Sequence, residues 1–209
     1  MGLYVETRIR ADVDTVWRRT QDPAAHQSWD LRFTRIEPLA SGPGQARRFR
    51  YAVRVLPGLT VSGSGVHAGE RHRPDGTRTS ALRFASDHPL SLIAEGSGYW
   101  RYVPDAGGVR FLTGYDYAPR WGRVGGLVDR FAFRPLMGWG TAWSFDRLRL
   151  WCERGIAPRR SLRNALLDVG LRVGAVLAAA RVRPALAVVV GALAVAAPPA
   201  PARPSARRC

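Results

Sequence analysis

The stretch VETRIRADVDTVWRRTQDPAAHQSWD, residues 5–30, passes from a strand pattern to a helix pattern within a few residues. Apolar and polar side chains alternate from Leu3 to Ile9, which predicts a half-buried β-strand. Asp12 then stands where a helix N-cap is expected, ahead of apolar residues at helical spacing. Residues 22–30 are typical of a turn or a second short helix. The chain therefore begins with a strand followed directly by short helical segments.

Residues 31–118 read as a series of strands. The strand-like runs span 31–38, 46–56, 59–70, 77–86, 90–104 and 108–118. Clusters of Gly, Pro and Asp separate them, at 41–44, 57–58, 73–76, 87–89 and 105–108. Because connections this short cannot hold a crossover helix, successive strands are expected to pair antiparallel in a meander.

After Pro119 the pattern changes to that of a long helix over residues 122–153. A wide apolar face is expected on it, formed by Leu136, Trp139, Gly140, Trp143, Arg147 and Leu150. Pro135 removes one backbone hydrogen bond, so we expect a kink that divides the helix into segments 122–133 and 136–153.

The last part of the chain combines apolar helices with arginine. Ser161 is a candidate cap for a helix running to Arg183, and Pro184 separates it from a second apolar run, 185–197. We expect a domain over residues 1–153, a basic and apolar helical tail over 154–198, and a disordered tail rich in Pro and Arg over 199–209.

The charge of the chain points to an anionic surface. The net charge is +16, all 32 basic residues are arginine, and residues 151–209 hold 10 of them against only Glu153 and Asp168. Basic density beside apolar sequence favours an anionic membrane over nucleic acid, which we do not expect as a partner. The absence of an apolar run near Glu6, Arg8 and Arg10 predicts a cytoplasmic protein at the inner membrane face.

The apolar tail does not read as a single membrane span. The 13 residues 185–197 are fewer than the roughly 20 needed, and a longer window encloses Arg181 and Arg183. Three arrangements stay open for residues 161–197: a hairpin dipping into the bilayer, an amphipathic pair lying at its interface, or helices packed on the domain.

The sequence carries none of the usual catalytic signatures. There is no nucleophile elbow, no phosphate-binding loop and no zinc-protease motif, and the four histidines lack metal-ligand spacing. We therefore expect neither a metal nor a cofactor. His67 and Glu95 are the candidate proton-transfer groups, although alternation turns Glu95 outward unless the register shifts by one residue.

Strand alternation places aromatic rings and glycines on the same face of the predicted sheet. Large rings beside missing side chains leave room for a cavity, in which tyrosine hydroxyls need partners. The candidate ligand-binding residues are Phe49, Tyr51, His67, Trp100, Tyr115, Trp139 and Trp143.

This order of elements resembles the START-like helix-grip superfamily (SRPBCC), which includes polyketide cyclase/dehydrase and lipid-transport proteins. The resemblance covers residues 1–153 and rests on the first strand, the Val16-Trp17 pair, Asp22 in the following turn, and Trp29. It implies an α+β fold in which a curved antiparallel sheet of six or seven strands wraps a long kinked C-terminal helix, with an apolar cavity between them. No catalytic motif carries over.

Three functions stay open on this basis. The first is a binder of a hydrophobic small molecule or lipid, held at a membrane by its tail. The second is an enzyme of the cyclase or dehydrase kind. The third is an interaction module whose tail docks a membrane or a protein partner.

Overall fold

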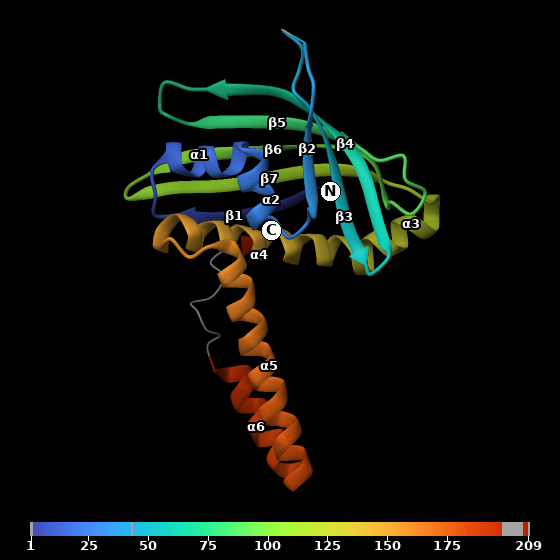
Figure 1. Ribbon diagram of the computed structural model, residues 1–209, viewed down its shortest axis with the longest axis vertical. Helices are drawn as coiled ribbons and strands as arrows, with labels where there is room; N and C mark the ends of the chain where they lie inside the picture. Colours follow the sequence, from blue (N-terminus) through green and yellow to red (C-terminus); the bar gives the residue numbers. More distant parts are fainter. Residues whose placement is uncertain (1, 43, 198–206, 209) are drawn as a thin grey trace.

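The computed structural model describes residues 2–42, 44–197 and 207–208, and it has the α+β helix-grip architecture (Figure 1). A curved antiparallel sheet lies over one long helical segment, and two further helices project from that segment as a hairpin. The strand order is β2-β3-β4-β5-β6-β7-β1-β8. The expected sheet of six or seven strands is therefore confirmed, with the two-residue β8 (Arg207–Arg208) added at its edge.

The first thirty residues fold as their pattern predicts. They form β1 (Leu3–Ile9), α1 (Val13–Gln21) and α2 (Pro23–Trp29). The carboxylate of Asp12 accepts a hydrogen bond from the amide of Thr15 at 2.7 Å, which caps α1. Asp22 caps α2 in the same way, through the amides of Ala24 and Ala25. Asp22 thus ends α1 and begins α2.

The meander follows with short turns. Its strands are β2 (Arg35–Leu39), β3 (Arg48–Leu56), β4 (Leu59–His72), β5 (Arg78–Ala85), β6 (Ile93–Asp105) and β7 (Gly108–Pro119). Successive strands pair antiparallel, and β1 closes the order by pairing with β7. The described end of the chain returns to this edge, where β8 pairs with Val5 and Glu6.

The glycines on the inner face seat aromatic rings from the neighbouring strand. Gly65 lies opposite Phe49, and Gly63 lies opposite Tyr51. A Cβ atom at Gly63 would lie 2.3 Å from the Tyr51 hydroxyl oxygen and 2.5 Å from the Ala85 carbonyl oxygen. These glycines therefore allow close ring packing, and the cavity that we expected beside them is filled there by the rings themselves.

We expect Gly63→Val to lower the free energy of unfolding by about 1–3 kcal/mol, because the new side chain overpacks the sheet. Urea unfolding followed by circular dichroism measures the change. Gly58→Ala cannot serve as the control, because Gly58 has a φ of 84°, which alanine rarely adopts, and the variant would lose stability through backbone strain. Ser62→Val, at an exposed neighbouring position of β4, is the matched control and should change stability little. An equal loss of stability in both variants would contradict the close packing of the Tyr51 ring on Gly63.

The long helix is interrupted where Pro135 predicts, but by a π-helical turn. It consists of α3 (Gly122–Val128), the π-turn η1 (Asp129–Phe133) and α4 (Arg134–Arg154). The side turned to the sheet carries residues at a spacing of four: Gly125, Asp129, Phe133, Met137 and Thr141. The apolar face expected around Leu136 and Trp139 is wrong, because these side chains are 62% and 51% exposed. Within α4 the buried face is formed instead by Thr141, Phe145 and Leu148, which lie on the opposite side of the helix from Leu136 and Trp139.

The core lies between the sheet and the C-terminal half of α4. Phe145 and Leu148 of α4 are fully buried against Val5, Phe111 and Trp29. Phe145 and Phe111 are 4.5 Å apart between ring centroids, and Trp29 lies edge-on to Phe145 at 6.3 Å. The Trp29 indole donates to the Arg19 carbonyl at 2.9 Å, which joins α2 to α1. This core holds α1 and α2 over one end of the sheet.

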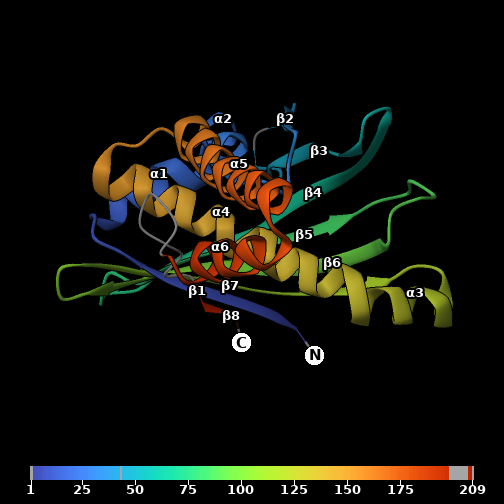
Figure 2. The same cartoon turned by 90° about the horizontal axis from the view of Figure 1, so that it is seen from below.

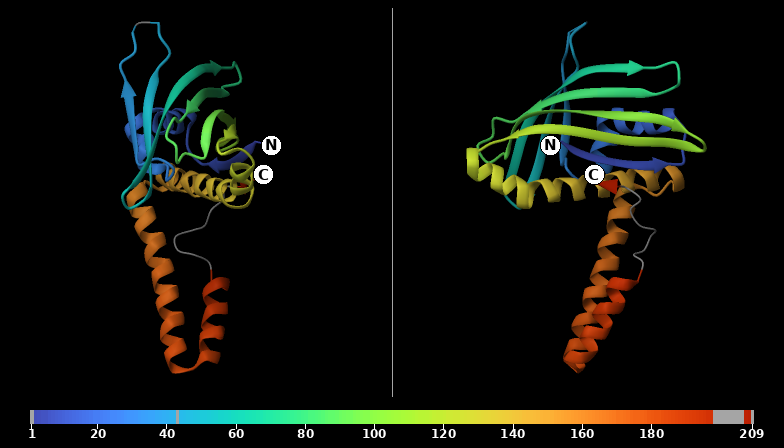
Figure 3. Two further views of the ribbon diagram at one scale, coloured as in Figure 1. Left: turned by 90° about the vertical axis from the view of Figure 1, so that its right-hand side faces the viewer. Right: turned by 180° about the vertical axis from the view of Figure 1, so that it is seen from behind.

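Two helices leave the domain together, as Figure 3 shows from two sides. They are α5 (Pro158–Val182) and α6 (Pro184–Ala196), and no residue of α6 is buried. The predicted break at Pro184 is confirmed, whereas α5 begins at Pro158, so the expected cap at Ser161 is wrong. Among the described residues, no helix has the length and apolarity needed to cross a membrane. Residues 199–206 and 209 of the predicted disordered tail lie outside the described part.

Candidate ligand cavity

A cavity of about 340 Å³ lies between the sheet and the α1–α2 pair. Its lining comes from α1, α2, β2, the start of β3, and β4 to β6. The lining residues are Thr20, Gln21, Pro23, His26, Ile36, Pro38, Leu39, Ser41, Arg47, Arg48, Phe49, His67, Ser80, Leu82 and Trp100. None of them comes from α4. The expected position between the sheet and the long C-terminal helix is therefore corrected: α1, α2 and β2 close this cavity.

Three of the seven predicted ligand-binding residues, Phe49, His67 and Trp100, line this cavity. The other four lie elsewhere. Tyr51 is buried against Phe33 and Gly63, and Tyr115 is buried with its hydroxyl 3.2 Å from the Thr141 hydroxyl. Trp139 and Trp143 contact each other on α4, with ring centroids 4.9 Å apart.

His67 lines the cavity and carries a buried polar atom without a partner in the described part of the chain. Its Nδ1 atom is buried and has no hydrogen-bond partner within the described residues. Burial lowers the pKa of His67, and the nearby positive charge of Arg47 lowers it further. The imidazole is therefore neutral at pH 7, with one ring nitrogen that donates a hydrogen bond and one that accepts.

His26 lines the same cavity and was missed by the sequence interpretation. Its ring stacks on Trp29 at 5.1 Å and meets Trp100 and Phe33 edge-on at 4.7 and 5.2 Å. Its Nε2 atom lies 3.1 Å from Oδ2 of Asp30. The only sequence signal for this pair is the spacing of four residues between His26 and Asp30 across the end of α2.

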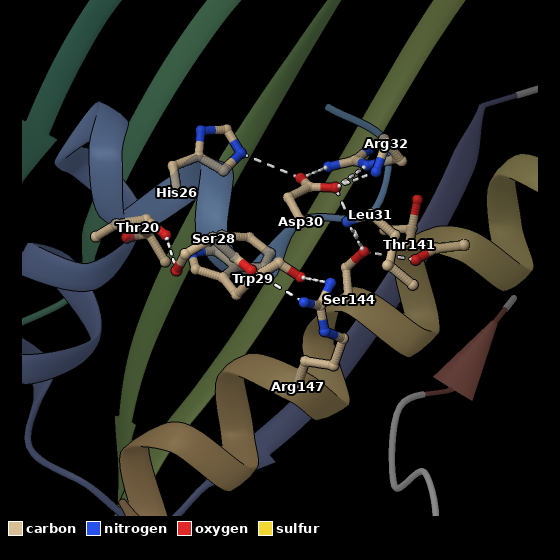
Figure 4. A network of polar contacts seen from close by, with 12 residues as sticks. Thr20, His26, Ser28, Trp29, Asp30, Leu31, Arg32, Thr141, Ser144 and Arg147 are labelled. Carbon is tan, nitrogen blue, oxygen red and sulfur yellow. Dashed lines mark hydrogen bonds and ion pairs between the residues drawn. The ribbon is translucent and has the colours of Figure 1, made fainter. Parts of the chain in front are cut away.

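Asp30 is the centre of the polar network shown in Figure 4. Its carboxylate receives Arg32 Nη2 at 2.6 Å and Arg32 Nε at 2.9 Å, and its side chain is fully buried. Burial alone would raise the pKa of Asp30, but the charge of Arg32 and the hydrogen bonds from His26 and Arg32 outweigh it. The pKa of Asp30 is therefore held far below its usual range, and the carboxylate stays charged.

Residues of α4 complete this network. The Ser144 hydroxyl lies 3.3 Å from Asp30 Oδ1 and accepts the amide of Leu31 at 2.9 Å. Arg147, which is 4% exposed, donates to the carbonyls of Trp29 and Ser28 at 2.9 and 3.0 Å (Figure 4). A cation at the carboxyl end of α2 is favourable for the helix dipole. The long helix therefore fixes the segment that carries His26 without lining the cavity itself.

Gln21 and Ser80 form a second polar group of the wall. The Gln21 amide donates to the Tyr102 hydroxyl at 3.0 Å and accepts from the Ser80 hydroxyl at 3.3 Å. Tyr102 is fully buried, and burial raises the pKa of its hydroxyl well above the usual range. The cavity thus combines rings with a few fixed polar groups, an arrangement that orients a mostly apolar molecule by one polar end.

Glu95 lies on the other side of the sheet. It is exposed and borders a depression on the outer face with Ser97 and Asp116. The irregular pairing between Ile93 and Glu95 does not turn it inward. Of the two candidate proton-transfer groups, only His67 therefore reaches the cavity. Within the described ranges, no three His, Cys, Asp or Glu residues gather as a metal site.

The comparisons with known proteins agree with this fold. A family model described as "Polyketide cyclase / dehydrase and lipid transport" matches residues 2–150. The uncharacterized membrane protein YndG of Bacillus subtilis (strain 168) is 48% identical over 168 residues, which are 80% of this chain. The chain spans 63% of the length of that curated relative.

Two solved structures illustrate the range of proteins that share the fold. A STAR-related lipid transfer protein from Xanthomonas axonopodis is 21% identical, with a TM-score of 0.54 over 71% of this chain and 83% of that one. The Zhui aromatase/cyclase from Streptomyces sp. R1128 is 15% identical, with a TM-score of 0.52 over 74% of this chain and 97% of that one. At these identities the likeness shows the fold alone.

Proposed function

The chain belongs to the polyketide cyclase/dehydrase and lipid transport family, and from that premise we propose that it binds a compact hydrophobic molecule at an anionic membrane surface. The bound molecule occupies the cavity beside α1 and α2, and the α5–α6 hairpin holds the protein at the membrane. The observation that carries the proposal is the cavity itself: apolar walls with a few convergent polar groups.

The cavity volume limits the size of the molecule. About 340 Å³ lies near the lower end of the volumes found for ligand pockets, roughly 300–1,000 Å³. Trp100 and Phe49 offer flat apolar surfaces, and His67 and Gln21 offer hydrogen bonds. These features favour a small hydrophobic molecule, or a single chain or ring of a lipid, with one polar group. Apolar burial supplies the binding energy, and the polar groups orient the molecule.

The hairpin supports the membrane part of the proposal. Where α5 and α6 face each other, four of the less exposed residues are small, namely Ala179, Ala187, Gly191 and Ala194, and they are joined by Arg172, Val176 and Val190. The large apolar side chains point outward instead, among them Leu177, Leu186 and Leu193, and the turn of the hairpin carries the exposed Arg181 and Arg183. Small residues inside and large apolar residues outside are typical of helices packed within lipid. The exposed arginines 159, 160 and 163 at the base of the hairpin favour anionic headgroups.

A second candidate function is proton transfer of the cyclase or dehydrase kind. It is favoured by one observation: two imidazoles, His26 and His67, line one cavity, and Asp30 orients the first of them. Such a pair can take a proton from a bound molecule at one nitrogen and return one at the other. Turnover lost in His26→Phe, with ligand binding retained, distinguishes this enzyme from a binding protein.

Extraction of the purified full-length protein with organic solvent, followed by mass spectrometry, tests the proposed binding. We expect the extract to contain about one molecule of ligand for each protein molecule. Ligand-free protein should bind that molecule again. His67→Phe keeps the ring but removes both nitrogen atoms, so affinity should fall about tenfold to a hundredfold. His72→Phe is the matched control, because His72 is exposed and lies outside the cavity lining. Extracts that repeatedly lack such a molecule would count against the proposal.

A further inference from the structure

The long helix exposes a large apolar surface at its N-terminal end. The side chains of Val124, Leu127, Val128, Phe131, Leu136 and Trp139 are between 40% and 71% exposed. We call these six residues the α3–α4 outer face. They do not belong to the cavity or to the α5–α6 hairpin, so neither the ligand nor the hairpin packing accounts for them.

The opposite side of the same helix explains why these residues cannot turn inward. Asp129 accepts a hydrogen bond from the Tyr117 hydroxyl and pairs with Arg134 at 3.0 Å. Farther along, the Thr141 hydroxyl lies 3.2 Å from the Tyr115 hydroxyl. These contacts fix the rotation of the helix about its axis. The outer face is therefore exposed as a consequence of the fold, and rotation of the helix cannot bury it.

The outer face lies at the end of the domain from which the hairpin leaves. In Figures 1 and 3, α3 and α4 run along the lower edge of the domain, and α5–α6 descend from that edge. The turn between β3 and β4 reaches the same edge, and its Val55 and Leu56 are 54% and 60% exposed. Figure 2 shows this side directly, with the hairpin pointing toward the viewer and α4 crossing behind it.

Charge identifies what covers this surface. Arg54, Arg123 and Arg130 are exposed beside the apolar residues. The one acidic residue between positions 120 and 140, Asp129, is buried and paired. A second copy of this face would bring like charges together, whereas an anionic bilayer offers both apolar depth and negative headgroups. A helix with an apolar face and arginines beside it is typical of segments that lie in the membrane interface.

We infer that the α3–α4 outer face is a second membrane contact, which lies in the interface of an anionic bilayer while the hairpin enters it. This inference rests on the proposed membrane association, and it adds the orientation of the domain relative to the bilayer. The loop between β2 and β3 lies at the opposite end of the domain (Figure 1). Leu39, Ser41 and Arg47 of the cavity lining lie in or beside that loop, so this part of the lining lies away from the bilayer.

Fluorescent labels on single cysteines test this orientation in the full-length protein. Cys152→Ser with Cys209→Ser removes the native thiols, and an environment-sensitive dye is attached to Phe131→Cys, Ser41→Cys or Val195→Cys. The vesicles contain phosphatidylcholine and phosphatidylglycerol in a ratio of 7:3, with and without brominated acyl chains. We expect the dye at position 131 to shift to the blue and to lose about half or more of its emission on brominated vesicles. The dye at position 41 should keep its emission.

The label on the hairpin separates failure of the inference from failure of the proposed function. Quenching at position 195 without quenching at 131 overturns the second contact and leaves the hairpin association intact. An absence of quenching at both positions, with no co-sedimentation, overturns both. A blue shift at 131 that needs no vesicles and grows with protein concentration means that a second copy covers the face, which also overturns the inference.

Discussion

Replacing Asp30 by alanine is expected to lower the free energy of unfolding by about 3–5 kcal/mol, the cost of leaving a buried charge without its partner. Arg32, whose side chain is 12% exposed, would keep its guanidinium inside the protein after the carboxylate is removed. His26 and Ser144 would lose their contacts with the carboxylate as well. Urea unfolding at pH 7, followed by circular dichroism, measures the loss.

The pair Asp105–Arg8 supplies the matched control. It joins the same residue types at 3.1 Å, but at the surface, where the two side chains are 42% and 55% exposed. Asp105→Ala should therefore cost about 1 kcal/mol or less. If the two alanine variants lose equal stability, the Asp30 network does not have the structural role described here.

The pH dependence gives an independent test of the same group. Because the pKa of Asp30 is lowered on folding, its contribution is complete above the unfolded value of about 3.9 and declines as the pH falls below it. The stability difference between the wild type and Asp30→Ala should therefore be constant from pH 7 to about 5 and become smaller below about pH 4. A difference that stays constant down to pH 2.5 would contradict the lowered pKa.

The sheet could be predicted from the sequence because its side chains alternate over long runs. The predicted strands 59–70 and 108–118 became Leu59–His72 and Gly108–Pro119, and Asp12 caps α1 as its position indicated. Turn residues gave the boundaries, since Gly and Pro mark backbone conformations that other residues adopt poorly. Local patterns were sufficient here because antiparallel pairing joins neighbours in the chain.

The cavity wall depends on contacts that no local pattern contains. Asp30 and Ser144 are 114 positions apart in the chain, and the hydrogen bond between them forms only when α4 packs against the end of α2. Phe49 and Tyr51 share a face of β3 and each covers a glycine of β4, but Tyr51 also contacts Phe33, whereas Phe49 contacts His67 and lines the cavity. Because Phe33 and His67 come from other parts of the chain, alternation along β3 alone could not separate the two rings.

The error on the long helix concerns which side of α4 faces the sheet. Leu136, Trp139 and Trp143 share one side of this helix, and Phe145 and Leu148 share the opposite side. Trp139 lies outward, in contact with Trp143. Phe145 and Leu148 provide the buried face instead. Leu136 and Trp139, which we expected to face the sheet, are 62% and 51% exposed.

Leu186→Asp combined with Leu193→Asp is expected to lower the partition of the full-length protein onto anionic vesicles by about a hundredfold or more. The reason is that each aspartate at membrane depth costs on the order of 3 kcal/mol, and less near the interface. Both leucines point outward from α6, where they are 43% and 64% exposed, so the changes leave the packing of α6 on α5 intact. Co-sedimentation with vesicles of phosphatidylcholine and phosphatidylglycerol in a ratio of 7:3 measures the partition.

Charge and apolar burial have to be separated in this experiment, because the double variant also reduces the net positive charge. Ser62→Asp with Ser64→Asp adds the same two charges at exposed positions of β4 and removes no apolar side chain. If attraction to anionic lipid alone held the protein, both double variants would bind equally weakly, and salt near 0.5 M would release the wild type. If the hairpin enters the bilayer, only the α6 variant loses its binding, and the wild type stays bound in salt. The outward leucines predict the second outcome, because headgroup attraction does not require large apolar side chains on the exposed side of a helix pair.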